Sequence, residues 1–237
     1  VFQTNRSPRI ATAHSQIVGS HYKNKTMKRI LSLIFILTIL FSGTKIVAQS
    51  DHLEPANSVF TILDYQFEYY SQVRNILFKD LDDNPEFRFL VMPSFSPENV
   101  LNIGLNHDTK KYFVSYHIGN ESIWYSENKE KIKVIKRKKE ISQESVELIK
   151  ELYKIAISKT KYIEKDYIEL DGETYYFSIN DHGQKTGITW SPTKGTIMAE
   201  LVLIGNELIK MTEEKKSLVS INQDLKIRIE NLIKKIK

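Results

Sequence analysis

One apolar segment near the beginning limits how much of this chain can contribute to a folded domain. Residues 30–41 are almost entirely apolar and follow a positively charged stretch, Met27-Lys28-Arg29. A positive region, an apolar helix of about 7–15 residues and small residues before a cleavage point make up a secretory signal peptide. We therefore expect residues 27–50 to direct export and to be removed, with the cut after Ala48 or, as second choice, after Ser50.

The alternative for this segment is an uncleaved membrane anchor. A spanning helix needs about 20 apolar residues, and Gly43 and Lys45 interrupt the stretch. Residues 1–26 contain no acidic residue and are expected to be an upstream extension, with Met27 as the true start, or else a presequence for another route. The expected location is the periplasm, the cell surface or the extracellular space, with no membrane span in the mature chain.

The positive charge of the chain is concentrated in this leader. The formal net charge is +5, from 34 basic and 29 acidic residues. Residues 1–50 hold seven of the basic residues and none of the acidic ones, which leaves 27 against 29 and a net charge of −2 after Ser50. Because nucleic-acid binding depends on a basic surface, no nucleic-acid partner is expected.

The chain contains no cysteine. Disulfide bonds and thiolate zinc sites are therefore excluded, and so is lipid attachment through a cysteine thiol. The mature chain of about 187 residues is long enough to bury one ordinary core, and packing alone has to stabilise it. We expect no cofactor and no metal, because neither a two-histidine helical motif nor a glycine-rich phosphate loop is present.

Two kinds of pattern follow the leader. Apolar residues between Phe60 and Leu77 recur at three- and four-residue steps, which predicts an amphipathic helix followed by a linker in residues 51–85. Further helices are expected over 142–157, where Ser142 can cap the first turn, and over 197–211. Alternating apolar residues and turn-forming pairs predict strands at residues 87–91, 100–105, 111–117, 122–125, 132–138, 167–170, 174–179 and 187–190.

These elements define the expected fold. The class is α+β over residues 86–211, with an antiparallel sheet of about five to seven strands, two packed helices and a long C-terminal helix. Strand 132–138 carries several lysines, which is typical of a solvated edge strand, because charge there discourages pairing with another chain. A nucleic-acid patch is the alternative for this basic run.

Residues 212–237 differ from the rest in having a seven-residue repeat. Such a spacing predicts an amphipathic or coiled-coil helix, in which Lys215 and Asn222 would lie on the seam. The helix could form a homo-oligomer through residues 213–237 or pack on its own domain. The repeat consists of Met211, Leu218, Leu225 and Leu232.

Two loops place an imidazole beside a carboxylate. His107 precedes Asp108, and Asp181 precedes His182, each in a predicted turn. Such pairs can orient a general base or bind a metal. The alternative is that these residues are only the polar residues that turns commonly contain. The catalytic candidates of this chain are these two pairs.

Aromatic side chains give a second group of candidates. Trp124, Tyr125 and Trp190, with Tyr175 and Tyr176, could form a platform on which a sugar ring or a peptide stacks. The alternative is that these residues lie in predicted strands and face a core. The expected partner is accordingly an unknown protein or glycan.

A set of short motifs is similar to a group of small exported bacterial proteins of unknown function. The motifs are Glu86-Phe87-Arg88, Pro93-Ser94-Phe95, Asp171-Gly172 and Trp190-Ser191-Pro192. The resemblance implies a domain and a location but no reaction.

The same motifs carry structural expectations. Arg88 lies inside an apolar strand and needs a partner, for which Glu173 or Asp171 is a hypothesis. Pro93 should end its strand, Gly172 should allow a tight turn, and Pro192 should start the last helix of the domain.

Taken together, these patterns favour a non-enzymatic binding or scaffolding domain of the cell envelope. One alternative is a hydrolase or metal-dependent enzyme that uses His107 or His182. A pocket around either histidine, with a second polar side chain in hydrogen-bond reach, would favour the enzyme. Another alternative is an inhibitor or immunity-type protein, which would present a rigid acidic or aromatic patch without a pocket.

Overall fold

The computed structural model describes residues 51–56, 63–162 and 171–237. The expected extension 1–26, the expected signal peptide 27–50 and the predicted strand 167–170 lie outside these ranges. All described residues belong to one compact unit, Gln49–Lys237. Within these ranges, none of the helices has the length and apolar character that crossing a bilayer requires.

The centre of the described residues is an eight-stranded sheet with the order β1-β7-β6-β2-β3-β4-β5-β8. Neighbouring strands are antiparallel except for β5 and β8, which run parallel. The strands are β1 (Glu54–Pro55), β2 (Phe87–Pro93), β3 (Asn99–Asn106), β4 (Lys111–Gly119), β5 (Val134–Ile141), β6 (Glu173–Asn180), β7 (Gln184–Trp190) and β8 (Leu218–Val219).

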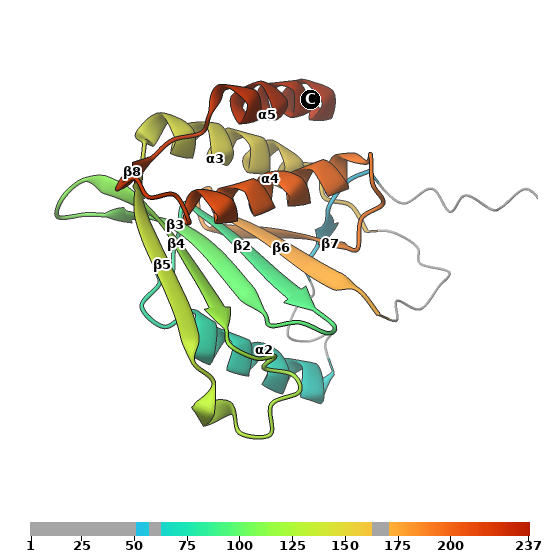
Figure 1. Ribbon diagram of the computed structural model, residues 1–237. Coiled ribbons are helices and arrows are strands. Elements are labelled where there is room, and N and C mark those ends of the chain that lie inside the picture. Colours follow the sequence, from blue (N-terminus) through green and yellow to red (C-terminus); the bar gives the residue numbers. More distant parts are fainter. Residues whose placement is uncertain (1–50, 57–62, 163–170) are drawn as a thin grey trace, which may run out of the picture. The chain divides into compact units, whose positions relative to one another are not determined.

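Helices cover both faces of this sheet (Figure 1). Two of them lie on one face with a third packed over them, and the remaining helix lies on the opposite face. On the first face are α3 (Gln143–Ser158) and α4 (Ile197–Met211), covered by α5 (Gln223–Ile236), and on the second is α2 (Asp64–Leu77). The predicted α+β class with an antiparallel sheet is confirmed, and the two-residue strands β1 and β8 extend that sheet at its edges.

Local sequence explains where the helices begin. The side chain of Ser142 accepts a hydrogen bond from the Ser145 amide at the start of α3, as predicted. Thr196 and Asn222 do the same for α4 and α5 by accepting from the amides of the third helical residue. Each cap satisfies one of the amides that a first turn leaves without a partner.

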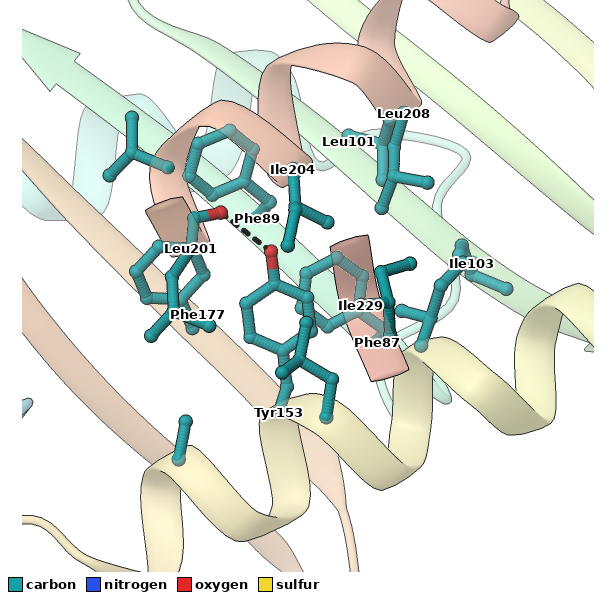
Figure 2. Packing of buried hydrophobic residues seen from close by; sticks show 14 of the residues in the cluster. Phe87, Phe89, Leu101, Ile103, Tyr153, Phe177, Leu201, Ile204, Leu208 and Ile229 are labelled. Atoms are coloured by element: carbon teal, nitrogen blue, oxygen red, sulfur yellow. Dashed lines mark hydrogen bonds between the residues drawn. The ribbon is translucent and has the colours of Figure 1, made fainter. Parts of the chain in front are cut away.

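The main core lies between the sheet and helices α3 and α4 (Figure 2). Aromatic rings from β2, β6 and α3 stack on one another, with Phe87–Tyr153 and Phe89–Phe177 centroids 4.3 and 5.1 Å apart. The buried Tyr153 hydroxyl donates to the Leu201 carbonyl of α4 at 2.8 Å, so its polar atom is satisfied.

A smaller cluster lies on the other face of the sheet, under α2. Its buried members come from α2, β2, β3 and the segment after β4. They are Val73, Leu77, Met92, Val100 and Ile123. Because the residues of a strand alternate between faces, β2 contributes Phe87, Phe89 and Val91 to the main core and Met92 to this smaller one.

The C-terminal tail differs from the prediction. Residue Leu218 lies in β8, and the helix begins only at Gln223. The expected seam residue Asn222 is instead the N-cap of α5. Helix α5 buries Leu225, Ile229 and other apolar residues against its own domain, so the seven-residue repeat serves intramolecular packing. The prediction of one continuous coiled-coil helix over residues 213–237 was wrong.

The lysine-rich strand β5 pairs with β8 only through Glu140 and Ile141. Residues Val134 to Lys139 therefore run along the outer side of the sheet, as predicted for an edge strand. Two of its basic groups form ion pairs within the domain, Lys136 with Asp80 at 2.6 Å and Arg137 with Glu213 at 2.7 Å.

Candidate functional site: an aromatic pocket

Three strand ends meet at one corner of the sheet. Pro93 at the end of β2 lies opposite Glu173 at the start of β6, and Thr174 pairs with Trp190 at the end of β7. Beyond β2, the Ser94 amide and hydroxyl both donate to the Gly172 carbonyl at 2.8 Å. Three of the short motifs quoted above, those that contain Pro93, Gly172 and Trp190, therefore lie side by side, whereas Glu86-Phe87-Arg88 lies at the opposite end of β2.

Gly172 is required at this corner by close approach. A Cβ atom at this position would lie 2.4 Å from the Ser191 hydroxyl oxygen and 2.6 Å from the Trp190 ring. Any side chain at residue 172 would thus displace the indole of Trp190. The predicted tight turn at Gly172 falls partly on residues outside the described ranges. Among the described residues, the close packing of Trp190 and Ser191 explains why residue 172 is glycine.

Helix α2 brings aromatic residues to the same corner. Tyr65 and Tyr69 are four residues apart, as are Gln66 and Tyr70, so all four lie on neighbouring positions of one helical face. Tyr70 contacts Tyr176 of β6 edge to face, with ring centroids 6.4 Å apart.

The third wall is the turn that contains Trp124 and Tyr125. The sequence predicted a strand at residues 122–125, which was wrong, because the Ser126 amide donates to the Ser122 carbonyl and closes a turn. The indole of Trp124 packs edge to face on Tyr69 and on Tyr65, with centroids 4.8 and 6.2 Å away.

Glu98 holds this turn from inside the protein. The residue is 0 % exposed, and its carboxylate accepts from the amides of Ile123 at 2.7 Å and Trp124 at 3.2 Å. It also accepts from the Tyr69 hydroxyl at 2.6 Å. A buried carboxylate is tolerated only when its oxygens are hydrogen-bonded, so Glu98 ties the turn to α2.

Lys129 binds the opposite end of the turn. Its ammonium group donates to the carbonyls of Ile123 and Ser126, both at 3.0 Å. The carboxylate of Glu98 thus binds the free amides and the ammonium of Lys129 binds the free carbonyls. This arrangement fixes the Trp124 backbone before any ligand arrives.

The three walls enclose an open pocket of about 380 Å³. Its described lining includes five tyrosines and two tryptophans. Several of these rings reach solvent, since Tyr65 is 55 %, Trp124 45 % and Tyr125 58 % exposed. Polar groups between the rings come from Gln66, Ser94, Asp171 and Thr174.

Two of the tyrosines around the pocket, Tyr69 and Tyr176, remain neutral donors. Burial raises the pKa of Tyr69 far above its usual range, and the Glu98 carboxylate raises it further. Burial, with the neighbouring Tyr70, likewise raises the pKa of Tyr176. Neutral phenols supply ring faces for stacking and hydroxyls for hydrogen bonds.

The structure brings together the aromatic residues that the sequence singled out. Trp124, Tyr125, Trp190 and Tyr176 all line the pocket. Tyr175 points to the other face of the sheet and lies in the main core, where its hydroxyl donates to Glu173. The core alternative therefore applies to Tyr175 and not to the others.

The histidine candidates lie away from this pocket. His107 is exposed in the turn between β3 and β4, and His182 is exposed between β6 and β7. Both turns lie at the end where β2 begins, about 20 Å along the strand from the pocket. Neither imidazole has a hydrogen-bond partner among the described residues, and Asp108 is exposed as well.

Asp181 has another role than orienting His182. Its carboxylate pairs with Lys154 at 2.6 Å and Lys185 at 2.7 Å, and hydrogen bonds from these lysines lower its pKa to about 2. Among the described residues, the buried histidine is His117, whose Nδ1 lies 2.8 Å from the Leu77 carbonyl. Metal-binding groups of three or more His, Asp or Glu side chains are absent from the described part of the chain.

Two structural expectations need correction. Arg88 is not paired with Glu173 or Asp171, since its guanidinium donates to the Asn102 side chain at 3.0 Å and the Asp82 carbonyl at 2.5 Å. It also lies 4.1 Å from the centroid of the Phe78 ring. Burial, together with Arg74, lowers the pKa of Arg88 to about 10.

Pro192 does not start α4, because that helix begins at Ile197 after the Thr196 cap. Pro93 does end β2, as predicted.

Glu98 was not predicted as a site residue, and neither Tyr65 nor Tyr69 belongs to the apolar stripe that predicted this helix. Their four-residue spacing was a usable signal for a shared helical face. Which loop would face them was not visible in the sequence.

Comparison with protein-family models, with curated proteins and with solved structures found no match.

Proposed function

We propose that this protein is an exported binding domain of the cell envelope that holds a small ligand in the aromatic pocket without chemical conversion. The observation that supports this most is the exposure of Tyr65, Trp124 and Tyr125 around a pocket fixed by Glu98 and Lys129. Large aromatic surfaces gathered on one exposed face are typical of binding sites. The signal peptide predicted over residues 27–50 supports the proposed location.

The pocket favours binding over the other two classes. A hydrolase centred on His107 or His182 would need a second polar group beside the imidazole, and both side chains instead project into solvent. An inhibitor or immunity-type protein would present its aromatic residues on a flat or convex patch. Here the rings surround a hollow, so a small ligand or a narrow segment of a polymer fits better.

The proposal is tested by following the indole N–H resonance of Trp124 in the full chain while fractions of a cell-envelope extract are added. A Trp124→Ala variant identifies the resonance and should lose the response. Phe95→Ala serves as the matched control, because Phe95 is 71 % exposed and does not line the pocket. If no fraction shifts the Trp124 resonance, the pocket is not a binding site and the proposal fails.

A homo-oligomer through residues 213–237 is a separate proposal. Since α5 uses most of its apolar face internally, the exposed apolar residues Leu218 and Ile227 would have to form the contact. Light scattering of the full chain should then give a dimer, and the pair Leu218→Ser and Ile227→Ser should dissociate it. A full chain that is monomeric at high concentration would reject the proposal.

A further inference from the structure

We infer that the ligand of the aromatic pocket is an uncharged carbohydrate; this inference rests on the proposed function and names the chemical class that the pocket recognises. Three features of the pocket carry it: the charge of its lining, the kinds of polar group between the rings, and the way the rings pack.

The charge of the described lining disfavours anionic ligands. Among the described residues that line the pocket there is no Lys, Arg or His, and the charged side chain is the carboxylate of Asp171. A phosphate, a nucleotide or an acidic sugar would meet this carboxylate without a cation to offset its own charge. The nearby Lys129 does not fill this role, since its ammonium group donates to two backbone carbonyls behind Trp124.

The polar groups match a ligand with many hydroxyls. Gln66 offers its amide N–H groups as donors, since its Oε1 already accepts from the Leu63 amide at 3.1 Å, and Thr174 offers a hydroxyl that can donate or accept. The carboxylate of Asp171 has two oxygens and can accept from two neighbouring hydroxyls at once. A sugar ring presents hydroxyls at its edge and C–H groups on its faces, so it can use these polar groups and the ring faces together.

The packing of the rings distinguishes a stacking platform from a cage for an organic cation. Such a cage requires several ring faces turned towards one centre. Here the ring centroid of Trp124 lies 4.8 Å from that of Tyr69 and 6.2 Å from that of Tyr65, so these rings contact one another and leave no room for a cation between them. The pocket volume of about 380 Å³ is larger than a single ammonium group needs and suits a sugar.

The pocket wall formed by Trp124, Tyr69 and Tyr65 is also held in place, which matters for a weakly interacting ligand. Sugar binding replaces many hydrogen bonds to water, so little free energy is left over for ordering a loop. The hydrogen bonds from Glu98 and Lys129 place the Trp124 turn in advance, and Gly172 allows Trp190 to approach β6 closely. The site therefore has its stacking surface formed without ligand.

The test is a calorimetric and fluorescence titration of the full chain with defined probes. The neutral probes are the tetrasaccharides of cellulose, starch, xylan and chitin, and the charged probes are tetragalacturonate and tetramethylammonium. We expect at least one neutral tetrasaccharide to bind, with little dependence on salt because no ion pair forms. Tyr125→Ala should weaken this binding about tenfold or more through lost stacking.

Control variants separate binding from folding. Tyr162→Ala removes a tyrosine that is 87 % exposed and outside the pocket, and it should leave the affinity unchanged. Asp171→Asn keeps an acceptor oxygen and should weaken the neutral sugar about tenfold or less. If the ligand were a cation, the same change would abolish binding, and if it were an anion, the change would strengthen it.

Each outcome has a distinct meaning. Binding of a neutral tetrasaccharide that Tyr125→Ala weakens supports the inference. Binding of only tetragalacturonate or tetramethylammonium, with a shift of the Trp124 resonance, overturns the carbohydrate class but leaves the pocket as a binding site. If no neutral probe binds although an envelope fraction shifts that resonance, the inference also fails alone. If neither the probes nor the envelope fractions shift it, both proposals fail.

Discussion

The two faces of the sheet use the same strands for different purposes. On the α3 and α4 face, β2 places Phe87 and Phe89 in a fully buried aromatic stack (Figure 2). On the α2 face, the same strand places Arg88 beside Asn102. One face is thus continuous apolar core, and the other mixes buried polar groups with partly exposed rings.

This difference indicates where stability and function lie. Burial of apolar area is the main stabilising contribution to folding, so the larger and drier face supplies most of the stability. The α2 face gives up part of that contribution, because Tyr65, Trp124 and Tyr125 remain in contact with water. A substitution on the first face should therefore alter stability, and one at the pocket should alter binding.

The largest effect is expected for Phe89→Ala. This fully buried ring stacks on Phe177 and approaches Gly205 of α4 so closely that a Cβ there would lie 2.6 Å from it. Removing it should lower the free energy of unfolding by about 3–5 kcal/mol. Denaturation in urea measures this value.

The matched comparison for Phe89→Ala is Trp124→Ala. Because the indole is 45 % exposed, its removal should cost much less stability while it reduces ligand binding. Equal losses of stability in the two variants would contradict the division between the faces.

An intermediate effect is expected for Glu98→Gln. The amide keeps one acceptor oxygen but places a donor against the Ile123 or Trp124 amide, both of which now donate to the carboxylate. Leaving one such donor unsatisfied should cost about 1–3 kcal/mol. The turn should also loosen, so ligand affinity should fall even where the protein remains folded.

Glu127→Gln is the control for this change. Glu127 is an exposed carboxylate just after the same turn, and its replacement should change neither stability nor affinity. Amide hydrogen exchange at Ile123 and Trp124 gives a second measurement, since these amides should exchange faster only in Glu98→Gln. Unchanged exchange there would show that Glu98 does not hold the turn.

The two faces also differ in how far the sequence predicted them. The strands and helices of the main core follow from alternation and from caps such as Ser142, which are local signals. The pocket depends on contacts between residues distant in sequence, such as Tyr69 with Glu98 and Ser94 with Gly172. Trp124 was recognised as a candidate, but the turn that presents it was predicted as a strand.

Two further errors share a physical reason. The seven-residue repeat from Met211 predicted a long helix. The structure instead places β8 within this segment, and β8 pairs with Glu140 and Ile141 of β5. Arg88 was expected to need a carboxylate, and an amide, a carbonyl and the Phe78 ring satisfy it instead. In both cases tertiary neighbours overrode a local pattern.

The smallest effect concerns His117, which lies on the α2 face and is buried. Burial lowers the pKa of this imidazole below its usual value, as does the nearby Lys136, while the Leu77 carbonyl and Asp80 act in the opposite direction. The folded protein thus binds a proton less readily than the unfolded chain, whose histidine titrates near about 6.5. Stability should therefore fall as the pH falls through this value, down to the pKa of the folded state.

His117→Asn tests this dependence, because the asparagine amide can still donate to the Leu77 carbonyl from nearly the same position as Nδ1. Urea denaturation at about pH 7.5 and pH 5.5, on either side of the unfolded pKa, should show a larger loss of stability for the native chain than for this variant. Exposed His107→Asn should leave the native dependence unchanged. If the native chain and His117→Asn lost equal stability on acidification, protonation of other groups would cause the loss. The α2 face would then accommodate a charged His117 at no cost in stability, contrary to the desolvation penalty expected for a buried imidazolium.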